Sequence, residues 1–434
     1  MQVRELPNED HACGWFETLP PPAPARRLTG AVRADCAVIG AGFTGLAAAR
    51  QLASLRPDWQ VVLLDAARVG LGASGRNSGF LVDVWHYLPA RGVEGNRRLL
   101  RLGRAGRDNL GALVRMHGID CAWNEYGRLH GAAAERGMRA LETLQRGLDA
   151  MAEPYTWLDA PAVTRVTGTT HYRAAIHTPG GVLVQPAALA RGLAATLPDN
   201  VDLFEESPVH GIDVSRPFLL HGDSGQVRTD RLFLAANGYT PGLGFLRQRI
   251  FPLLTFASLS RVLTAQEQAA LGGEPEWGLV PEDPMGTTVR RTHDHRILIR
   301  HTVQYGTRIA GGAARLHTVR AAHRQAFRAR FSMLPGVDLE YTWGGVLGMT
   351  SNTGQWFGRA ADGLWMSAGC NGAGVALGTA LGGLLADLAL DADSALLRDA
   401  QALPRPGWLP AEPMTRLGVG AVLRLMAIRS RAEI

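Results

Sequence analysis

The chain has 434 residues, of which 46% are hydrophobic, and a formal net charge of +6. This length and composition predict a globular protein with a large core and roughly two or three domain-sized units. All 45 basic residues are arginine, which excludes a lysine Schiff base, a pyridoxal phosphate aldimine and a P-loop lysine. The arginines are scattered along the chain, so we expect no nucleic-acid partner.

The cysteines and the N-terminal residues indicate the cellular setting. Cys13, Cys36, Cys121 and Cys370 are widely spaced, which argues against a disulfide framework and a Cys-x-x-Cys metal site. No stretch approaches the ~20 apolar residues of a membrane span, and the N-terminus carries no signal-peptide core. We therefore expect a cytoplasmic enzyme without a metal or stable membrane insertion. Residues 1–33 are proline-rich and predict an arm outside the fold proper.

A dinucleotide-binding βαβ unit is predicted between Ala34 and Asp65. The apolar segment Cys36–Ile39 predicts a strand, the alanine-rich segment Leu46–Leu52 a helix, and Gln60–Leu64 a second strand rich in valine and leucine. A single glycine motif is weak evidence for such a unit. Strand, helix, second strand and terminal acid in the right order make the prediction specific.

Three glycines and one acid give this unit its chemistry. Gly40 permits the tight turn, Gly42 lets the backbone approach a pyrophosphate, and Gly45 allows the helix to pack closely on the sheet. The helix N-terminus favours the anionic phosphates, and Asp65 can accept hydrogen bonds from a ribose diol. The residues of this unit predicted to bind the cofactor are Gly40, Gly42, Phe43, Thr44, Gly45, Asp65 and Ala66.

The rest of the chain alternates between helical and strand-like segments, after a glycine-rich segment at Gly70–Phe80 that fits neither. In chain order we predict helices at Leu99–Met116 and Glu135–Met151 with a strand-like stretch between them, a helix starting after Gln185, strands at Val201–Glu205, Pro208–Val214 and Arg231–Ala235, a strand at Leu364–Ala368 and a helix at Val375–Leu390. The apolar tail Leu417–Ile428 predicts a helix that packs on the body of the protein, with a peripheral membrane contact as the alternative.

Residues 250–345 differ from the rest because they are rich in strand alternation. This predicts an inserted, mostly antiparallel sheet beside an α/β, Rossmann-like dinucleotide-binding domain. The predicted domains are an N-terminal arm (1–33), a discontinuous dinucleotide-binding domain (34–90, 150–245 and 345–400), a substrate or cap domain (91–149 and 246–344) and a C-terminal tail helix (401–434).

Together these landmarks resemble the FAD-dependent oxidoreductases of the D-amino-acid oxidase type, most closely the γ-glutamylputrescine oxidase-like and glycine oxidase branch. The resemblance runs from about Trp15 to Arg416, and its most specific motif is GASGRNSGF, Gly72–Phe80, which in that branch wraps the FAD. Further similar motifs are SPVHGI, LAANGYT, WGGVLGMTSNTGQWFG and SAGCNGAGV. The resemblance implies noncovalent FAD contacts from Gly72, Ala73, Ser74, Arg76, Asn77, Ser78, Gly79, Val209, Ala236, Gly238, Gly345, Gly369, Cys370, Asn371, Gly372 and Gly374.

The same resemblance implies oxidation of a C–N bond in a small amine or amino-acid-like substrate, by hydride transfer to flavin N5. The product would be an imine, with O2 reduced to H2O2. The candidate catalytic residues are Arg290 and His301, in the hairpin that lines the substrate side in relatives, and His86, which follows the Gly72–Phe80 segment that we call the flavin loop. Cys370 is a further candidate, which we interpret as a packing residue near the flavin rather than a covalent attachment point.

The sequence departs from the sarcosine-type members, because those carry a lysine that grips the substrate carboxylate and another that assists oxygen. This chain has no lysine, which argues against a small α-amino acid or sarcosine as the substrate, and against rapid use of O2 unless an arginine or histidine replaces that charge. The first alternative is an FAD-dependent dehydrogenase that passes electrons to a quinone or carrier. The others are an NAD enzyme and a non-catalytic or tRNA-modification flavoprotein module. Oligomeric state is also left open.

Overall fold

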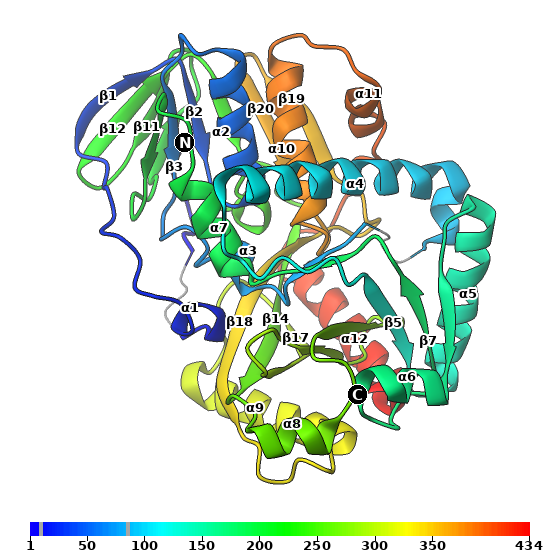
Figure 1. The fold of residues 1–434 in the computed structure, drawn as a ribbon. Helices are drawn as coiled ribbons and strands as arrows, with labels where there is room; N and C mark the ends of the chain where they lie inside the picture. Colours follow the sequence, from blue (N-terminus) through cyan, green and yellow to red (C-terminus); the bar gives the residue numbers. More distant parts are fainter. Residues whose placement is uncertain (8–11, 84–86) are drawn as a thin grey trace.

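The computed structural model describes residues 1–7, 12–83 and 87–434, so the candidate His86 lies outside the described residues. In Figure 1 the upper half is built on a mainly parallel sheet and the lower half on a larger, mainly antiparallel sheet. The two halves meet where α3 (Ala73–Arg76) packs on β18 (Leu339–Met349). This arrangement confirms the predicted fold class, a Rossmann-like α/β domain beside a mostly antiparallel one.

The upper half is centred on a six-stranded sheet in the order β19-β20-β13-β2-β3-β9. The bounds of these strands, in that order, are Trp356–Ala361, Leu364–Ala368, Leu232–Leu234, Cys36–Ile39, Val61–Leu64 and Val201–Phe204. Only the edge strand β19 pairs antiparallel within this sheet. The central strands are continuous apolar runs because both faces of the sheet are covered.

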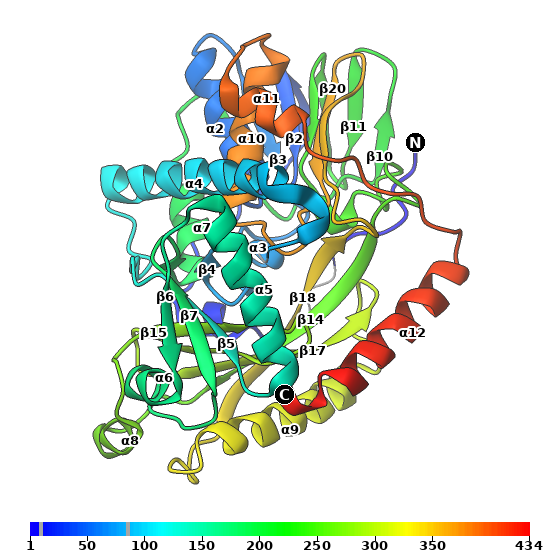
Figure 2. The same ribbon diagram turned by 90° about the vertical axis from the view of Figure 1, so that its right-hand side faces the viewer.

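Helices cover one face of this sheet and a second sheet covers the other. The helices are α2 (Phe43–Leu55), α10 (Ala376–Ala389) and α4 (Gly92–His117), which crosses over α10 (Figure 2). The second sheet has the order β1-β12-β11-β10, with bounds Gly30–Ala34, Gly225–Thr229, Phe218–His221 and Gly211–Asp213. Its apolar side packs against β2 and β3, so the nucleotide-binding turn stands on a fully buried scaffold.

The lower half is an eight-stranded sheet in the order β18-β14-β17-β16-β15-β5-β7-β6. The bounds after β18 are Phe251–Ser260, Ile297–Tyr305, Thr288–Arg291, Trp277–Pro281, Arg128–Ala132, Ala174–Thr178 and Thr156–Asp159. Only β15 and β5 pair parallel in it. One face packs on α9 (Gly312–Arg330), and the other faces α3. The sheet therefore covers the side of the upper half on which α3 lies.

Shorter elements complete the described fold. They are α1 (Gly14–Glu17), the pair β4 (Phe80–Leu81) and β8 (Val182–Leu183), η1 (Pro89–Arg91), α5 (Glu135–Met151), α6 (Ala160–Thr167), α7 (Pro186–Ala195), η2 (Asn237–Tyr239), α8 (Ala265–Leu271), α11 (Ala395–Gln401), α12 (Met414–Arg429) and η3 (Arg431–Glu433). Two sequence signals are confirmed here. The bounds of α5 are those predicted, and α7 begins directly after Gln185, as predicted. The structure adds that the Gln185 side chain caps this helix by accepting a hydrogen bond from the Ala188 N–H at 2.8 Å.

The domain boundaries differ from the prediction in three segments. We placed 150–178 in the dinucleotide half, yet β6 and β7 hydrogen-bond to each other and to β5 in the lower sheet. We placed 91–149 in the cap, yet α4 within it packs on α10. The arm, 1–33, contributes β1 to the second sheet of the upper half. In each case a distant strand or helix supplies the pairing, which local sequence does not encode.

The tail forms the expected helix, α12, and one side of it packs on the lower half while the other side is exposed. Within residues 1–7, 12–83 and 87–434, no helix is both long and apolar enough to cross a bilayer.

Candidate active site

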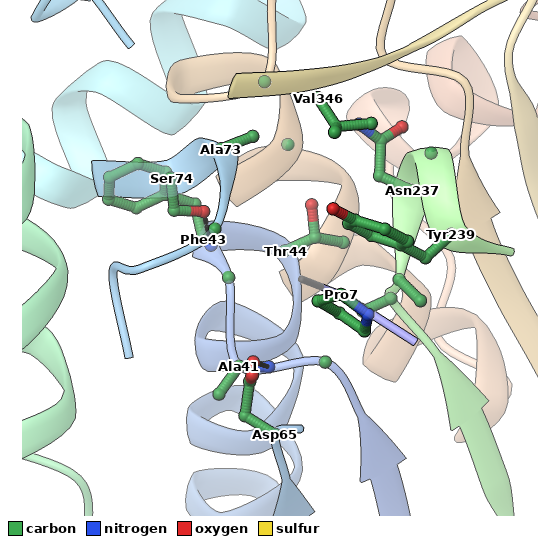
Figure 3. Close-up of a pocket in the computed structure, with 18 of the residues that line it drawn as sticks. Pro7, Ala41, Phe43, Thr44, Asp65, Ala73, Ser74, Asn237, Tyr239 and Val346 are labelled. Atoms are coloured by element: carbon green, nitrogen blue, oxygen red, sulfur yellow. Dashed lines mark hydrogen bonds between the residues drawn. The ribbon is translucent and has the colours of Figure 1, made fainter. Parts of the chain in front are cut away.

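A deep cavity opens at the carboxyl ends of β2, β3 and β13, between α2 and the closing strand β18 (Figure 3). Its empty volume is about 1490 Å³, counting the part open to solvent. The predicted cofactor residues that line it are Gly40, Gly42, Phe43, Thr44, Asp65, Ala66, Gly72, Ala73, Ser74, Asn77, Val209, Ala236, Gly238, Cys370, Gly372 and Gly374. The fold thus brings together residues from four distant segments around one space.

The glycine turn shapes the middle of the cavity. Gly40 has a φ of +102°, which a side chain would strain. A Cβ on Gly42 would lie 2.8 Å from Ser74 Oγ, the atom that accepts a hydrogen bond from Phe43 N at 3.2 Å. The N-cap of α2, Gly42, has no side chain to cap the helix, so the N–H groups of the first turn after Phe43 suit a pyrophosphate. Gly45 does not line the cavity, because it packs on Gly40.

Asp65 lies below the turn at the end of β3, as Figure 3 shows. One carboxylate oxygen accepts from Ala41 N at 2.7 Å and the other from Ala67 N at 2.9 Å. Burial raises the pKa of Asp65 to about 6, although both backbone hydrogen bonds lower it. Each oxygen keeps lone pairs for a further donor. Asp65 therefore fits a ribose diol, and the observed cradle fits an FAD.

Arg76 has a different role from the one the sequence suggested. We expected it to neutralise phosphate charge, but its side chain donates to the carbonyls of Leu71 and Gly344 and is buried. The Arg76 carbonyl in turn accepts from Trp343 Nε1 at 3.0 Å. Arg76 thus fastens the flavin-loop helix α3 to β18, and it is absent from the cavity lining. Ser78, another predicted cofactor contact, is also absent from the residues that line the cavity.

Neighbouring predicted residues also act on the protein itself. Asn77 lines the cavity, but its amide donates to Ser74 O at 2.6 Å and its oxygen accepts from Gly79 N at 2.8 Å. Asn371 is buried and accepts from Thr350 N at 2.9 Å. The predicted residues outside the cavity lining are Gly45, Arg76, Ser78, Gly79, Gly345, Gly369 and Asn371. Most of these hold the loops that the lining residues sit on.

Asn237 is a lining residue that the sequence did not single out. Its side-chain oxygen accepts from Gly369 N at 3.0 Å and from Cys370 N at 3.2 Å, so it ties the end of β13 to the closing turn. Its own φ of +42° is tolerated well by asparagine. Burial raises the pKa of the Cys370 thiol, which keeps it neutral and argues against a nucleophilic role.

The N-terminal residues also reach the cavity. Glu5, Leu6 and Pro7 line it, because the preceding residues run beside β10 and Val3 N donates to His210 O at 2.8 Å. The proline-rich composition gave no signal for this, since the segment makes its contacts with strands two hundred residues away.

The structure does not bring Arg290 or His301 to the cavity. The buried Arg290 guanidinium donates to the carbonyls of Gly79 (3.0 Å) and Val184 (2.5 Å) and pairs with Glu276 at 3.1 Å. His301 lies on the α9 face of the sheet, with its ring centroid 4.4 Å from that of His323. Burial lowers the pKa of His301 to about 2. Both side chains therefore hold the lower sheet together.

Arg300, beside His301 in the sequence, lies on the opposite face. Its cross-strand neighbours are Ala257 and Thr288. Ala257 is in turn cross-strand from Trp343, whose indole N–H donates to the carbonyl of Arg76 in the flavin loop. Since side chains alternate along a strand, Arg300 faces α3. Its guanidinium has no hydrogen-bond or ion-pair partner in the part of the chain that the structure describes. Burial lowers its pKa.

From the sequence we named His301 as a candidate, because its hairpin resembles that of relatives, and did not name Arg300. The two side chains differ in the face of the sheet that they occupy, because side chains alternate along β17, whose pairing with β14 is continuous from Leu298 to His301. Grouped side chains that could hold a metal ion are not found among the described residues.

Comparisons with known proteins agree with this geometry. Residues 35–388 match the family described as "FAD dependent oxidoreductase" (DAO). The chain is 28% identical to "Gamma-glutamylputrescine oxidoreductase" of Escherichia coli K12, over 84% of this chain and 86% of the relative. It is also 28% identical to "Probable oxidoreductase OrdL" of Rhizobium meliloti, over 87% and 88%.

Solved structures show the same fold. Glycine oxidase from Geobacillus kaustophilus superposes with a TM-score of 0.69 at 23% identity, covering 84% of this chain and 96% of that one. The family match spans most of the chain, and the cavity holds the βαβ turn, the ribose-binding acid and the flavin-loop motif that an FAD requires. The chain therefore belongs to the DAO family of FAD-dependent oxidoreductases.

Proposed function

We propose that this FAD-dependent oxidoreductase oxidises the C–N bond of an amino-acid-like amine that carries a carboxylate, with O2 as the final electron acceptor and H2O2 as its product. Bound FAD would accept a hydride at flavin N5 from the carbon next to the substrate nitrogen, leaving an imine that water hydrolyses. The relative from Escherichia coli and the glycine oxidase fold support an amine or amino-acid substrate.

The observation that carries the substrate class is the guanidinium of Arg300, for which the described part of the chain supplies no hydrogen-bond or ion-pair partner. A half-buried cation without an acceptor is costly, and a substrate carboxylate would supply the missing charge through a bidentate pair. Arg300 of β17 lies cross-strand from Ala257 of β14, which in turn lies cross-strand from Trp343 of β18. The Trp343 indole donates to the Arg76 carbonyl in the flavin loop. Arg300 therefore takes the carboxylate-binding role for which this chain has no lysine.

The chain's other residues would position the two reactants. The N-terminus of α2 and the Gly42 turn hold the pyrophosphate, Asp65 holds the ribose, and Asn237 fixes the closing turn beside the flavin. Arg76 and Arg290 anchor the flavin loop to the lower sheet and keep water from entering between the halves.

The first experiment is the visible spectrum of the purified holoprotein, followed by anaerobic mixing with a panel of amines. A two-band flavin spectrum, release of FAD on denaturation and bleaching by amines that carry a carboxylate are the expected results. Bleaching by carboxylate-free amines alone would contradict the role of Arg300. A colourless protein that takes up no added FAD would contradict the cofactor.

A second candidate function is a dehydrogenase that passes electrons to a quinone or carrier. The absence of any lysine favours it, because that cation assists oxygen in the sarcosine-type relatives, and the Arg76 guanidinium is bound to backbone carbonyls. Reoxidation in air separates the two functions. An oxidase recovers its spectrum within the time of a turnover, whereas a dehydrogenase stays bleached until a quinone is added.

We expect Asp65→Asn to weaken FAD binding about 10- to 100-fold, because hydrogen bonds to a charged acceptor are lost. In the wild type, affinity should fall as the pH drops through about 6, where Asp65 becomes protonated. FAD titration of the apoprotein by fluorescence between pH 5 and 8 would be the measurement. The matched control is Asp35→Asn. The Asp35 carboxylate, just before β2, also accepts a hydrogen bond from a backbone N–H, that of Gln60, but it lies outside the cavity. Equal losses in both variants would contradict the prediction.

A further inference from the structure

The exposed apolar surface of this protein is concentrated at its C-terminal end. Half of the large hydrophobic side chains that are exposed in the described residues lie between 408 and 428. They are Trp408, Met414, Leu417, Val422, Leu425 and Ile428. Isolated apolar residues on a surface are ordinary, but a contiguous group on one helix marks an interaction site.

The helix that carries them, α12, is held firmly at both ends. Just before the helix, Tyr305 of β17 donates to Glu412, and after it Ser430 Oγ donates to Asp283 at 2.6 Å. The Glu433 carboxylate then accepts from three backbone N–H groups at the start of α5, at 2.8–2.9 Å. Figure 2 shows α12 along the outer edge of the molecule. Its exposed side is therefore a fixed surface and not a frayed tail.

The apolar residues form a continuous line on that side. At 100° per residue, five exposed positions fall on one outward face. We call them the α12 stripe: Met414, Leu417, Ala421, Leu425 and Ile428. Arg424 and Arg429 lie on either side of the stripe and are both exposed. Long arginine side chains at such positions can keep their charge in water beside a buried apolar stripe.

The charge of the surface selects its partner. α12 contains no acidic residue. Of the acids near it, Glu412 accepts from Tyr305, Asp283 is buried and bonded to Ser430 and Arg136, and Glu433 is buried at α5. A second copy packed on this face would bring arginine against arginine with no carboxylate to pair them. An anionic lipid surface supplies the opposite charge and an apolar layer at once, and the exposed Trp408 suits the headgroup region.

We propose that α12 and Trp408 dock this enzyme on the surface of an anionic lipid bilayer. The α12 stripe enters the boundary between headgroups and acyl chains, with the helix parallel to the membrane plane, and Arg424 and Arg429 contact lipid phosphates. The contact is peripheral, because the helix packs on β17 and hydrogen bonds beside both its ends join the tail to the lower half. This inference is independent of the substrate and of the electron acceptor.

The experiment is sedimentation of the FAD-loaded protein with phosphatidylcholine vesicles, with and without phosphatidylglycerol. Binding is expected only to the anionic vesicles and should weaken as salt is raised. The variant Leu417→Asp/Leu425→Asp should lose vesicle binding by about tenfold or more, and Arg424→Gln/Arg429→Gln should lose its preference for anionic lipid. The matched control is Met116→Asp, an equally exposed apolar residue on α4, which should bind as the wild type does.

An unchanged flavin spectrum and melting temperature would show that the stripe variants are folded, since these side chains face outward. Equal sedimentation of wild type and stripe variant, or no sedimentation of either, would overturn the proposal. So would a dimer in lipid-free analytical ultracentrifugation that becomes monomeric in the stripe variant, since the face would then belong to a second copy.

Discussion

Replacing Gly382 by alanine is expected to destabilise the protein by about 3 kcal/mol or more and to abolish tight FAD binding. A Cβ at Gly382, in α10, would lie 2.1 Å from the carbonyl oxygen of Thr44 in the first turn of α2. Backbone cannot yield as a side-chain end can, so α10 would have to move away from α2. That shift displaces Thr44, which lines the cavity at the pyrophosphate turn.

The adjacent glycine is a matched control. A Cβ on Gly383 meets nothing within 4 Å, so Gly383→Ala should stabilise the same helix by up to about 1 kcal/mol through helix propensity. Urea denaturation of the two apoproteins, together with FAD titration, measures both effects. If the two variants unfold at the same urea concentration, the close approach of α2 and α10 is not what positions the turn.

Arg300→Gln is expected to reduce kcat/KM for a carboxylate-bearing amine about 100-fold or more. The substrate carboxylate would lose its charged partner in a half-buried site. A carboxylate-free analogue of the same amine should lose little, because it never used the guanidinium. The measurement is the rate of anaerobic flavin bleaching against substrate concentration, with the flavin spectrum as a check that the cofactor is undisturbed.

The comparison between the two amines separates a direct role of Arg300 in carboxylate binding from an indirect effect on the fold or the flavin. An equal loss for both would show that Arg300 acts on the fold or on the flavin and would remove the basis for the substrate class. A full loss of FAD would show the same. The preference for the carboxylate should disappear in the variant, with the uncharged analogue the better substrate.

Features that depend on a few adjacent residues could be read from the chain alone. The turn at Gly40 and Gly42, the helix Glu135–Met151 and the start of α7 after Gln185 were predictable because their physical causes are local. These causes are backbone freedom, apolar periodicity and a proline in the first helical turn. The cofactor follows from the same kind of signal, since the GASGRNSGF loop sits in a fixed place after the second strand.

Features that depend on partners far along the chain could not be read in this way. β6 and β7 joined the lower sheet, and residues 5–7 reached the cavity, through pairings that no local pattern specifies. Arg76 and Arg290 looked like ligand-binding cations, but backbone carbonyls brought close by the fold occupy them. The chain alone shows which side chains carry charge, not which of those charges the fold leaves unpaired.

The sequence by itself therefore determined the family, the cofactor and the nucleotide turn, because each is encoded in contiguous residues. Only the tertiary structure decided that Arg300, and not His301, faces the flavin loop, because adjacent side chains of β17 point to opposite faces and the packing of α3 and α9 on the sheet decides which face meets which helix. It also decided that α12 keeps an apolar stripe exposed, because its other side packs on β17 and hydrogen bonds beside both its ends join the tail to the lower half.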